Sequence, residues 1–248
     1  MLSKSQISFI KSLHQKKYRK EHGLFLVEGI KSITEFIKSS YQIHSVFYNS
    51  EQAHLLPELS ANINLFEVNN VELGKISTLQ TPQGFLAVIN IPKNKKLEHN
   101  ELRNQFTLVL DGVQDPGNMG TIIRTADWFG FKKIICSDDC VEVFNPKTVQ
   151  ATMGSLARVE IYTGDLAAIL SKSNIPVFGA LLNGESIYNV DWGNEGFVIL
   201  GNEGKGITPA VIEKVNKPVT IPRVGEAESL NVAVSAAIFC AELVRVKN

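Results

Sequence analysis

Residues 106–136 read FTLVLDGVQDPGNMGTIIRTADWFGFKKIIC. The segment opens with an apolar run typical of a buried strand, FTLVL (106–110), and closes with a second one, KIIC (133–136). Between them, GNMGTIIRTADWFG has the pattern of a helix that stops at Gly130. Two strands joined by a helix form the basic unit of a parallel sheet, so this stretch predicts an α/β fold.

The same alternation continues to the end of the chain. Further strands are expected at VEIY (159–162), IPVFGALL (175–182), GFVILG (196–201) and PVTI (218–221). Helices are expected over 145–158, 165–172, about 209–215 and about 229–245, with Ser229 as the cap of the last one. The pattern predicts a mostly parallel sheet covered by helices on both faces.

The N-terminal third predicts a separate, smaller α/β domain. Its expected strands are LFLVEG (24–29), IHSVFYN (43–49), NLFEV (64–68) and GFLAVINI (84–91), and its first helix is capped by Ser3 or Ser5. The basic stretch KKYRKEHG (16–23) breaks the helical pattern that precedes it. Residues 92–104 contain few apolar side chains, so we predict domains at 1–91 and 105–248 with a linker at 92–104.

Composition limits the classes of protein that this chain can belong to. The 248 residues are 44% hydrophobic and 20% charged, which is typical of a globular protein. No apolar run approaches the roughly 20 residues that span a bilayer, and the N-terminus lacks the apolar core of a secretory signal. Cys136, Cys140 and Cys240 do not have the spacing of a zinc site, so we expect a cytoplasmic protein without a membrane partner or a metal.

The net charge of zero conceals an asymmetry. Residues 1–100 carry 12 basic and 8 acidic side chains, a net of +4, and the remainder carries 25 − 12 = 13 basic and 25 − 8 = 17 acidic, a net of −4. The first 20 residues hold six basic side chains and no acidic one, among them Lys16, Lys17, Arg19 and Lys20. Such a cluster attracts a polyanion, although a solvated helix face gives the same pattern.

Three loops that follow predicted strands carry the polar residues that chemistry would need, because ligands of such sheets bind beyond the carboxyl ends of the strands. The first contains Asn118 and Arg124. The apolar neighbours of Arg124 would bury its stem, so its guanidinium would bind an anion or carbonyl or, alternatively, form an ion pair with Asp127 or Asp111. The second, LGNEGKGI (200–207), places Glu203 among three glycines, as in a ligand loop or an ordinary tight turn. The third places Ser229, Leu230 and Asn231 at a helix N-terminus, which offers unpaired N–H groups to a ligand. Alternatively, Ser229 is simply the cap of that helix.

Other familiar motifs are absent or defective. The glycines at 201, 204 and 206 do not form the dinucleotide fingerprint, and Glu185 occupies the lysine position of a P-loop-like spacing that begins at Gly179. The five histidines all precede residue 100, and no GxSxG motif is present.

The three loops NMGTIIRTADWFGF, FVILGNEGKGI and IPRVGEAESLNVAVSAAI resemble the three motifs of the SpoU/TrmH family of RNA 2′-O-ribose methyltransferases. The resemblance covers about residues 105–248, and residues 1–91 look like the RNA-binding domain that precedes the catalytic domain in many members. It implies a parallel sheet with a deep C-terminal trefoil knot, a homodimer whose active site is completed across the interface, and S-adenosylmethionine as cofactor. By the same resemblance, Leu181, Gly201, Ile221 and Leu230 would line the cofactor site.

The family assigns activation of the ribose hydroxyl to the arginine that matches Arg124. Because an ordinary guanidinium keeps its proton, either the site partly deprotonates Arg124 or a contacted phosphate takes the proton while Arg124 orients it. Asn118, Glu203, Ser229 and Asn231 would hold Arg124 and the ribose in place, and the N-terminal lysines and Arg19 would bind RNA.

The resemblance leaves the substrate open. Ribosomal RNA is the expected substrate, and transfer RNA is the alternative. A base methyltransferase of the wider knotted superfamily and a non-catalytic RNA-binding assembly factor are the competing functions.

Overall fold

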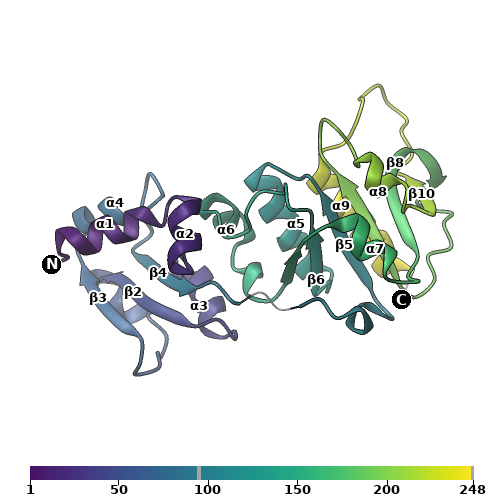
Figure 1. Cartoon of the computed structure of the whole chain (residues 1–248). Helices are drawn as coiled ribbons and strands as arrows, with labels where there is room; N and C mark the ends of the chain where they lie inside the picture. Colours follow the sequence, from purple (N-terminus) through teal and green to yellow (C-terminus); the bar gives the residue numbers. More distant parts are fainter. Residues whose placement is uncertain (94–95, 247–248) are drawn as a thin grey trace. The chain divides into compact units, whose positions relative to one another are not determined.

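A computed structural model describes residues 1–93 and 96–246 of the chain (Figure 1). The chain divides into two compact units, of which the first comprises Met1–Lys93 and Glu142–Arg158 and the second comprises Asn94–Val141 and Val159–Asn248. The sequence pattern placed 142–158 in the catalytic domain, whereas the contacts of this segment group it with the N-terminal residues. Among the described residues, no helix is both long and apolar enough to cross a membrane.

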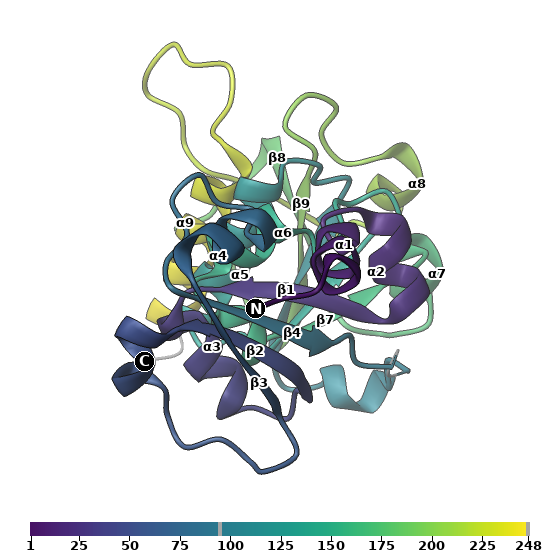
Figure 2. The ribbon, with the colours of Figure 1, turned by 90° about the vertical axis from the view of Figure 1, so that its left-hand side faces the viewer.

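The first unit is built on a four-stranded mixed sheet with strand order β1-β4-β2-β3, in which only β2 and β3 run parallel (Figure 2). Its strands are β1 (Leu24–Glu28), β2 (Ile43–Asn49), β3 (Asn64–Val68) and β4 (Phe85–Asn90). Its α-helices are α1 (Lys4–Ser12), α2 (Lys16–His22), α3 (Ile30–Ile37), α4 (Asn70–Ile76) and α6 (Pro146–Thr152), with 3-10 turns at Ser50–Leu55 and Ser155–Ala157. The strands agree with the expectation, but the basic stretch predicted to break the helical pattern is helix α2, which ends at Gly23 with φ +64°.

Both faces of β1 are buried, because successive side chains point to opposite sides of a strand. Leu24 and Leu26 pack in one cluster with apolar residues of α1 and α4. Phe25, which lies between them, contacts Phe36 of α3 and Phe144, with ring centroids 5.6 Å and 4.7 Å apart. The aromatic contact with Phe144 is one reason that residues 142–158 belong to this unit.

The second unit is built on a six-stranded parallel sheet with strand order β10-β8-β9-β5-β6-β7. Its strands are β5 (Phe106–Asp111), β6 (Lys133–Cys136), β7 (Glu160–Thr163), β8 (Val177–Ser186), β9 (Gly196–Gly201) and β10 (Lys217–Thr220). Its α-helices are α5 (Pro116–Trp128), α7 (Leu166–Ser171), α8 (Pro209–Ile212) and α9 (Val232–Arg245), with a 3-10 turn at His99–Leu102. The α/β class and the parallel sheet therefore agree with the expectation from the sequence.

Helices cover both faces of this sheet. Val109 and Ile199 of the central strands share an apolar cluster with residues of α7 and α8. The alternate residues Leu108 and Val198 are also fully buried, and α5 and α9 pack against each other on the remaining side (Figure 1). All six strands run in the same direction, so the loops after β5, β8, β9 and β10 leave from one edge of the sheet.

Candidate active site

The first of the three loops leads from β5 into α5. Asp115 caps the helix, since its carboxylate accepts a hydrogen bond from the backbone N–H of Asn118 (2.8 Å), and Pro116 occupies the first helical turn. This cap fixes the position of Asn118 at the open edge of the sheet.

The side chain of Asn118 connects all three loops. Its Nδ2 donates to Oε1 of Glu203 in the loop after β9 (2.6 Å), and its Oδ1 accepts from Nδ2 of Asn231 (3.0 Å). The sequence motifs that contain these three residues are up to 113 positions apart, and the structure brings them together. Since they are exposed or half-buried, their remaining hydrogen-bonding capacity faces outward.

The loop after β9 folds back on itself. Asn202 and Gly206 exchange backbone hydrogen bonds of 3.0 Å and 2.9 Å, and Oδ1 of Asn202 accepts from the N–H groups of Gly204 and Lys205. Gly201 lies so close to this turn that a Cβ atom there would be 2.3 Å from the carbonyl carbon of Gly206. A larger residue at position 201 would therefore displace the loop that carries Glu203.

Two residues that sequence reasoning did not select hold this loop to its neighbours. Nδ2 of Asn202 donates to the carbonyl oxygen of Gly112 (2.7 Å). The buried carboxylate of Asp111 accepts from both the backbone N–H and the hydroxyl of Thr208 (2.7 and 2.8 Å). Asp111 ends a buried strand and Asn202 directly follows one, which was a usable signal, but the sequence does not reveal that their partners lie 90 and 97 residues away.

The third loop differs from the expectation at its helix cap. Asn231, rather than Ser229, caps α9, because its side chain accepts from the N–H groups of Ala233 and Val234. Ser229 lies outside the helix in an exposed loop, and Leu230 is also exposed. Asn231 therefore both caps α9 and donates a hydrogen bond to Asn118.

Arg124 is exposed on α5, so the prediction of a buried stem is corrected. Helical spacing places it on the outward face that also carries Gly117, Thr121 and Trp128. Within the described part of the chain, Arg124 forms no ion pair, and Asp111, one of its suggested partners, binds Thr208 instead. Its guanidinium is available for a partner outside this chain.

The residues expected to line a cofactor site lie within or after three adjacent parallel strands, β8, β9 and β10. Gly201 ends β9, Ile221 follows β10, and Leu230 lies in the loop that follows it. Leu181 belongs to a stretch of β8 that leaves the ladder, since β10 pairs with β8 at 178–179 and again only at 185–186. Gly184 in this stretch passes against the backbone of Pro218, where a Cβ would be 2.6 Å from the carbonyl carbon.

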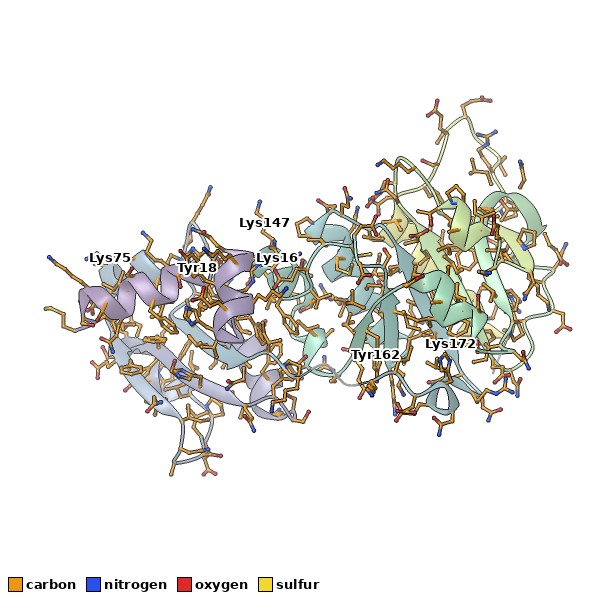
Figure 3. All side chains as sticks on the ribbon, viewed as in Figure 1. Lys16, Tyr18, Lys75, Lys147, Tyr162 and Lys172 are labelled. Carbon is orange, nitrogen blue, oxygen red and sulfur yellow. The ribbon has the colours of Figure 1, made fainter. Side chains whose placement is uncertain are left out.

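The basic helix α2 in the first unit presents three of its four expected cations to solvent. Lys16, Lys17 and Lys20 are exposed, and Lys147 on α6 extends into solvent as well (Figure 3).

Arg19 is different, because it is 1% exposed and pairs with Glu142. Its Nη1 donates to the carbonyl oxygens of Leu13 and His14, and its Nη2 lies 2.5 Å from Oε2 of Glu142. Its expected place on an RNA-binding surface is therefore corrected, since all of these donors are already engaged inside the unit.

The described residues contain no group of three or more His, Cys, Asp or Glu that could hold a metal ion. The fold and the joined loops define an α/β protein with a polar site at the carboxyl edge of a parallel sheet, where proteins of this class bind their ligands.

Residues 105–241 match the SpoU rRNA Methylase family, and residues 4–87 match the MRM3-like substrate binding domain. The chain therefore belongs to the SpoU methylase family and is a methyltransferase of that family. This result confirms the resemblance seen in the three motifs.

Relatives and solved structures agree with this assignment over nearly the whole chain. The 23S rRNA (guanosine(2553)-2'-O)-methyltransferase RlmP of Bacillus subtilis is 33% identical over 92% of each chain. A TrmH-family protein from Porphyromonas gingivalis is 38% identical, with a TM-score of 0.91 and 99% of each chain covered. The AdoMet-bound rRNA methyltransferase of Sinorhizobium meliloti is 27% identical, with a TM-score of 0.88 over 99% of this chain and 96% of that one.

Proposed function

We propose that this protein transfers a methyl group from S-adenosylmethionine to a ribose 2′-hydroxyl of ribosomal RNA in the cytoplasm. The observation that carries the proposal is the hydrogen-bonded set of Asn118, Glu203 and Asn231, which joins three loops at one edge of the sheet. The family assignment and the 2′-O-methyltransferase RlmP among the relatives support the same reaction.

The residues at the carboxyl edge fit this cofactor. Leu181, Ile221 and Leu230 offer apolar contacts, and the bend at Gly201 packs so closely against the backbone of Gly206 that it has no room for a side chain. S-adenosylmethionine supplies an electrophilic methyl group on a positively charged sulfur.

Arg124 is proposed to bind the phosphate next to the target ribose and to orient the 2′-hydroxyl toward the methyl group. A guanidinium with no ion-pair partner within the described chain suits this role, because it can bind phosphate through two parallel hydrogen bonds. Asn118, Glu203 and Asn231 position the ribose, and Ser229 beside them offers a further hydroxyl. The hydroxyl proton then passes to the phosphate or to water, which requires no metal.

We further propose a homodimer in which Arg124 of one subunit completes the site of the other. Trp128, one turn beyond Arg124, is 83% exposed, and Leu230, just before α9, and Val234, in the first turn of α9, are also exposed. Burial of a tryptophan in an interface is a large source of binding free energy.

Mixing the inactive variants Arg124→Ala and Glu203→Ala should restore roughly a quarter of the wild-type activity, because half of the dimers are mixed and each has one intact site. If the mixture regains no activity, each site is formed by a single subunit.

The RNA-binding surface is proposed to lie on the first unit and to comprise Lys16, Lys17, Lys20, Lys147 and Tyr18. Lysines bind phosphates without reading sequence, and a half-exposed tyrosine offers a ring on which a base can stack. Tyr18 stacks on His22 with centroids 6.3 Å apart, and Lys17 lies 5.5 Å from its ring centre, so the ring is already held in place.

The deep knot is proposed for the second unit. The tight passage of Gly184 against Pro218 supports it, because the chain that leads to α9 runs directly against the stretch of β8 that leaves the ladder. An experimental density map traced from 177 to 245 tests the threading of α9.

The reaction is tested by incubating the purified chain with ribosomal RNA and methyl-labelled S-adenosylmethionine, followed by nuclease digestion and mass spectrometry. The expected product is one 2′-O-methyl nucleoside, which also blocks alkaline cleavage at its phosphodiester. Transfer RNA serves as the matched control substrate. A methylated base would favour the base-methyltransferase alternative, and a failure to bind S-adenosylmethionine in calorimetry would favour a non-catalytic assembly factor.

A further inference from the structure

Two of the three cysteines lie together at the end of β6. Cys136 is the last residue of the strand, and Cys140 closes the following turn, with its N–H donating to the carbonyl oxygen of Ser137 (3.1 Å). Leu110 of β5 is the register partner of Cys136, and its carbonyl oxygen lies 3.4 Å from Sγ of Cys140. Both cysteines therefore lie beside the same residue of β5, and the interaction between their thiols lowers the pKa of Cys140 and raises that of Cys136.

The two thiols differ in reactivity. Cys140 is half-buried, and the neighbouring Cys136 thiol is the largest cause that lowers its pKa to about 7. Cys136 is buried, and its hydrogen bond to Cys140 together with burial raises its pKa well above the ordinary value. A reachable thiolate beside a buried thiol is the arrangement of an attacking and a resolving cysteine.

One residue separates this pair from the loop proposed to bind the cofactor. The N–H of Gly112 donates to Oγ of Ser137 (2.8 Å), and its carbonyl oxygen accepts from Asn202 (2.7 Å). Gly112 has φ +71°, and a Cβ on it would be 3.3 Å from Asp139 and 3.6 Å from Asn202, so it fits tightly between the two. The backbone of Gly112 therefore links the turn 137–140 to Asn202 and the loop 201–206.

We propose that Cys136 and Cys140 are a peroxide-sensitive dithiol, and that its conversion to a disulfide pulls the turn 137–140 away from Gly112 and lowers the affinity for S-adenosylmethionine. The predicted loss of affinity rests on the proposed cofactor site, whereas the formation of the disulfide does not.

The oxidant is a hydroperoxide, here hydrogen peroxide. The thiolate of Cys140 attacks one peroxide oxygen, the O–O bond breaks, and a sulfenic acid and hydroxide form. The sulfur of Cys136 then attacks the sulfur of the sulfenic acid, the S–O bond breaks, and a second hydroxide leaves. The two cysteines lose two electrons and two protons, and the peroxide is reduced to two molecules of water.

The test exposes the reduced whole chain to hydrogen peroxide, maps its peptides by mass spectrometry and measures S-adenosylmethionine binding by calorimetry. The expected result is a Cys136–Cys140 disulfide, accompanied by a loss of affinity of about ten-fold that dithiothreitol reverses. Cys240→Ala, a change at the buried cysteine of α9, should behave like the wild type, whereas Cys140→Ala should keep its affinity in peroxide.

Three outcomes separate the inference from the proposed function. If no Cys136–Cys140 disulfide appears in the wild-type peptide map, or if it appears with unchanged affinity, the inference is overturned. If the reduced chain does not bind S-adenosylmethionine at all, the proposed function fails instead, and with it the predicted effect of the disulfide.

Discussion

Arg19 of the first unit and Arg124 of the second unit are in opposite situations. In the first unit, Arg19 is buried, pairs with Glu142 and donates to two backbone carbonyls. In the second unit, Arg124 is exposed on α5 and has no ion-pair partner among the described residues. Removing a buried arginine whose donors are all engaged leaves its partners unpaired inside the fold, whereas an exposed arginine with no ion-pair partner is available for a ligand.

The largest expected effect is a loss of stability on replacement of the buried arginine. Replacement of Arg19 by Met should destabilise the first unit by about 3–5 kcal/mol, because Glu142 and two carbonyl groups lose their buried partner. Urea denaturation followed by circular dichroism measures the change. Lys20→Met, at an exposed position of the same helix, is the control and should shift stability by about 0.5 kcal/mol or less. A shift that small for Arg19 would contradict a structural role.

The link between the three loops should matter for rate rather than for folding. Asn118→Ala removes both the donor to Glu203 and the acceptor from Asn231, so we expect methyl transfer to slow by roughly 10–100-fold, as in other cases of lost positioning. Single-turnover assays with saturating cofactor and RNA give this rate. Gln114→Ala, an exposed change in the same loop, should leave it unaltered. Equal rates for the two variants would show that Asn118 has no role in the site.

The lysines of the first unit should have a smaller effect, confined to RNA affinity. Changing Lys16 and Lys147 together to Gln should weaken binding and its salt dependence, because each phosphate that is no longer neutralised lowers the log–log slope for a single strand by about 0.7. Filter binding across a salt series measures both quantities. Lys172→Gln, at an exposed lysine of the second unit, is the matched control (Figure 3). An unchanged slope would exclude this surface.

The smallest effect concerns Glu72, which lies in the first unit and is 7% exposed. Hydrogen bonds from the N–H groups of Leu2 and Asn69 hold the pKa of this carboxyl below its ordinary value. Because the folded-state pKa is lowered, the carboxylate adds stability above its ordinary pKa near 4.5, and that contribution is lost as the pH falls toward the folded value. Denaturation of Glu72→Gln should therefore differ more from wild type at pH 7 than at pH 3.5, and a constant difference would contradict the assignment.

The sequence was sufficient for features that local patterns determine. Runs such as FTLVL and LFLVE predicted strands, and Asn118, Glu203 and Asn231 were selected because they follow such strands. It could not distinguish Arg19 from its exposed lysine neighbours, because the residue that buries it, Glu142, is 123 positions away. The same long-range contact explains why residues 142–158 group with the first unit although nothing in their own pattern indicates it.

The most direct test of the account is the turnover of Arg124→Ala. We expect methyl transfer to fall by about 10²–10⁴-fold, the range for loss of a group that assists proton transfer, while cofactor affinity stays within a few-fold and the unfolding midpoint is unchanged. Near-normal turnover in this variant would show that the exposed guanidinium of α5 takes no part in the reaction.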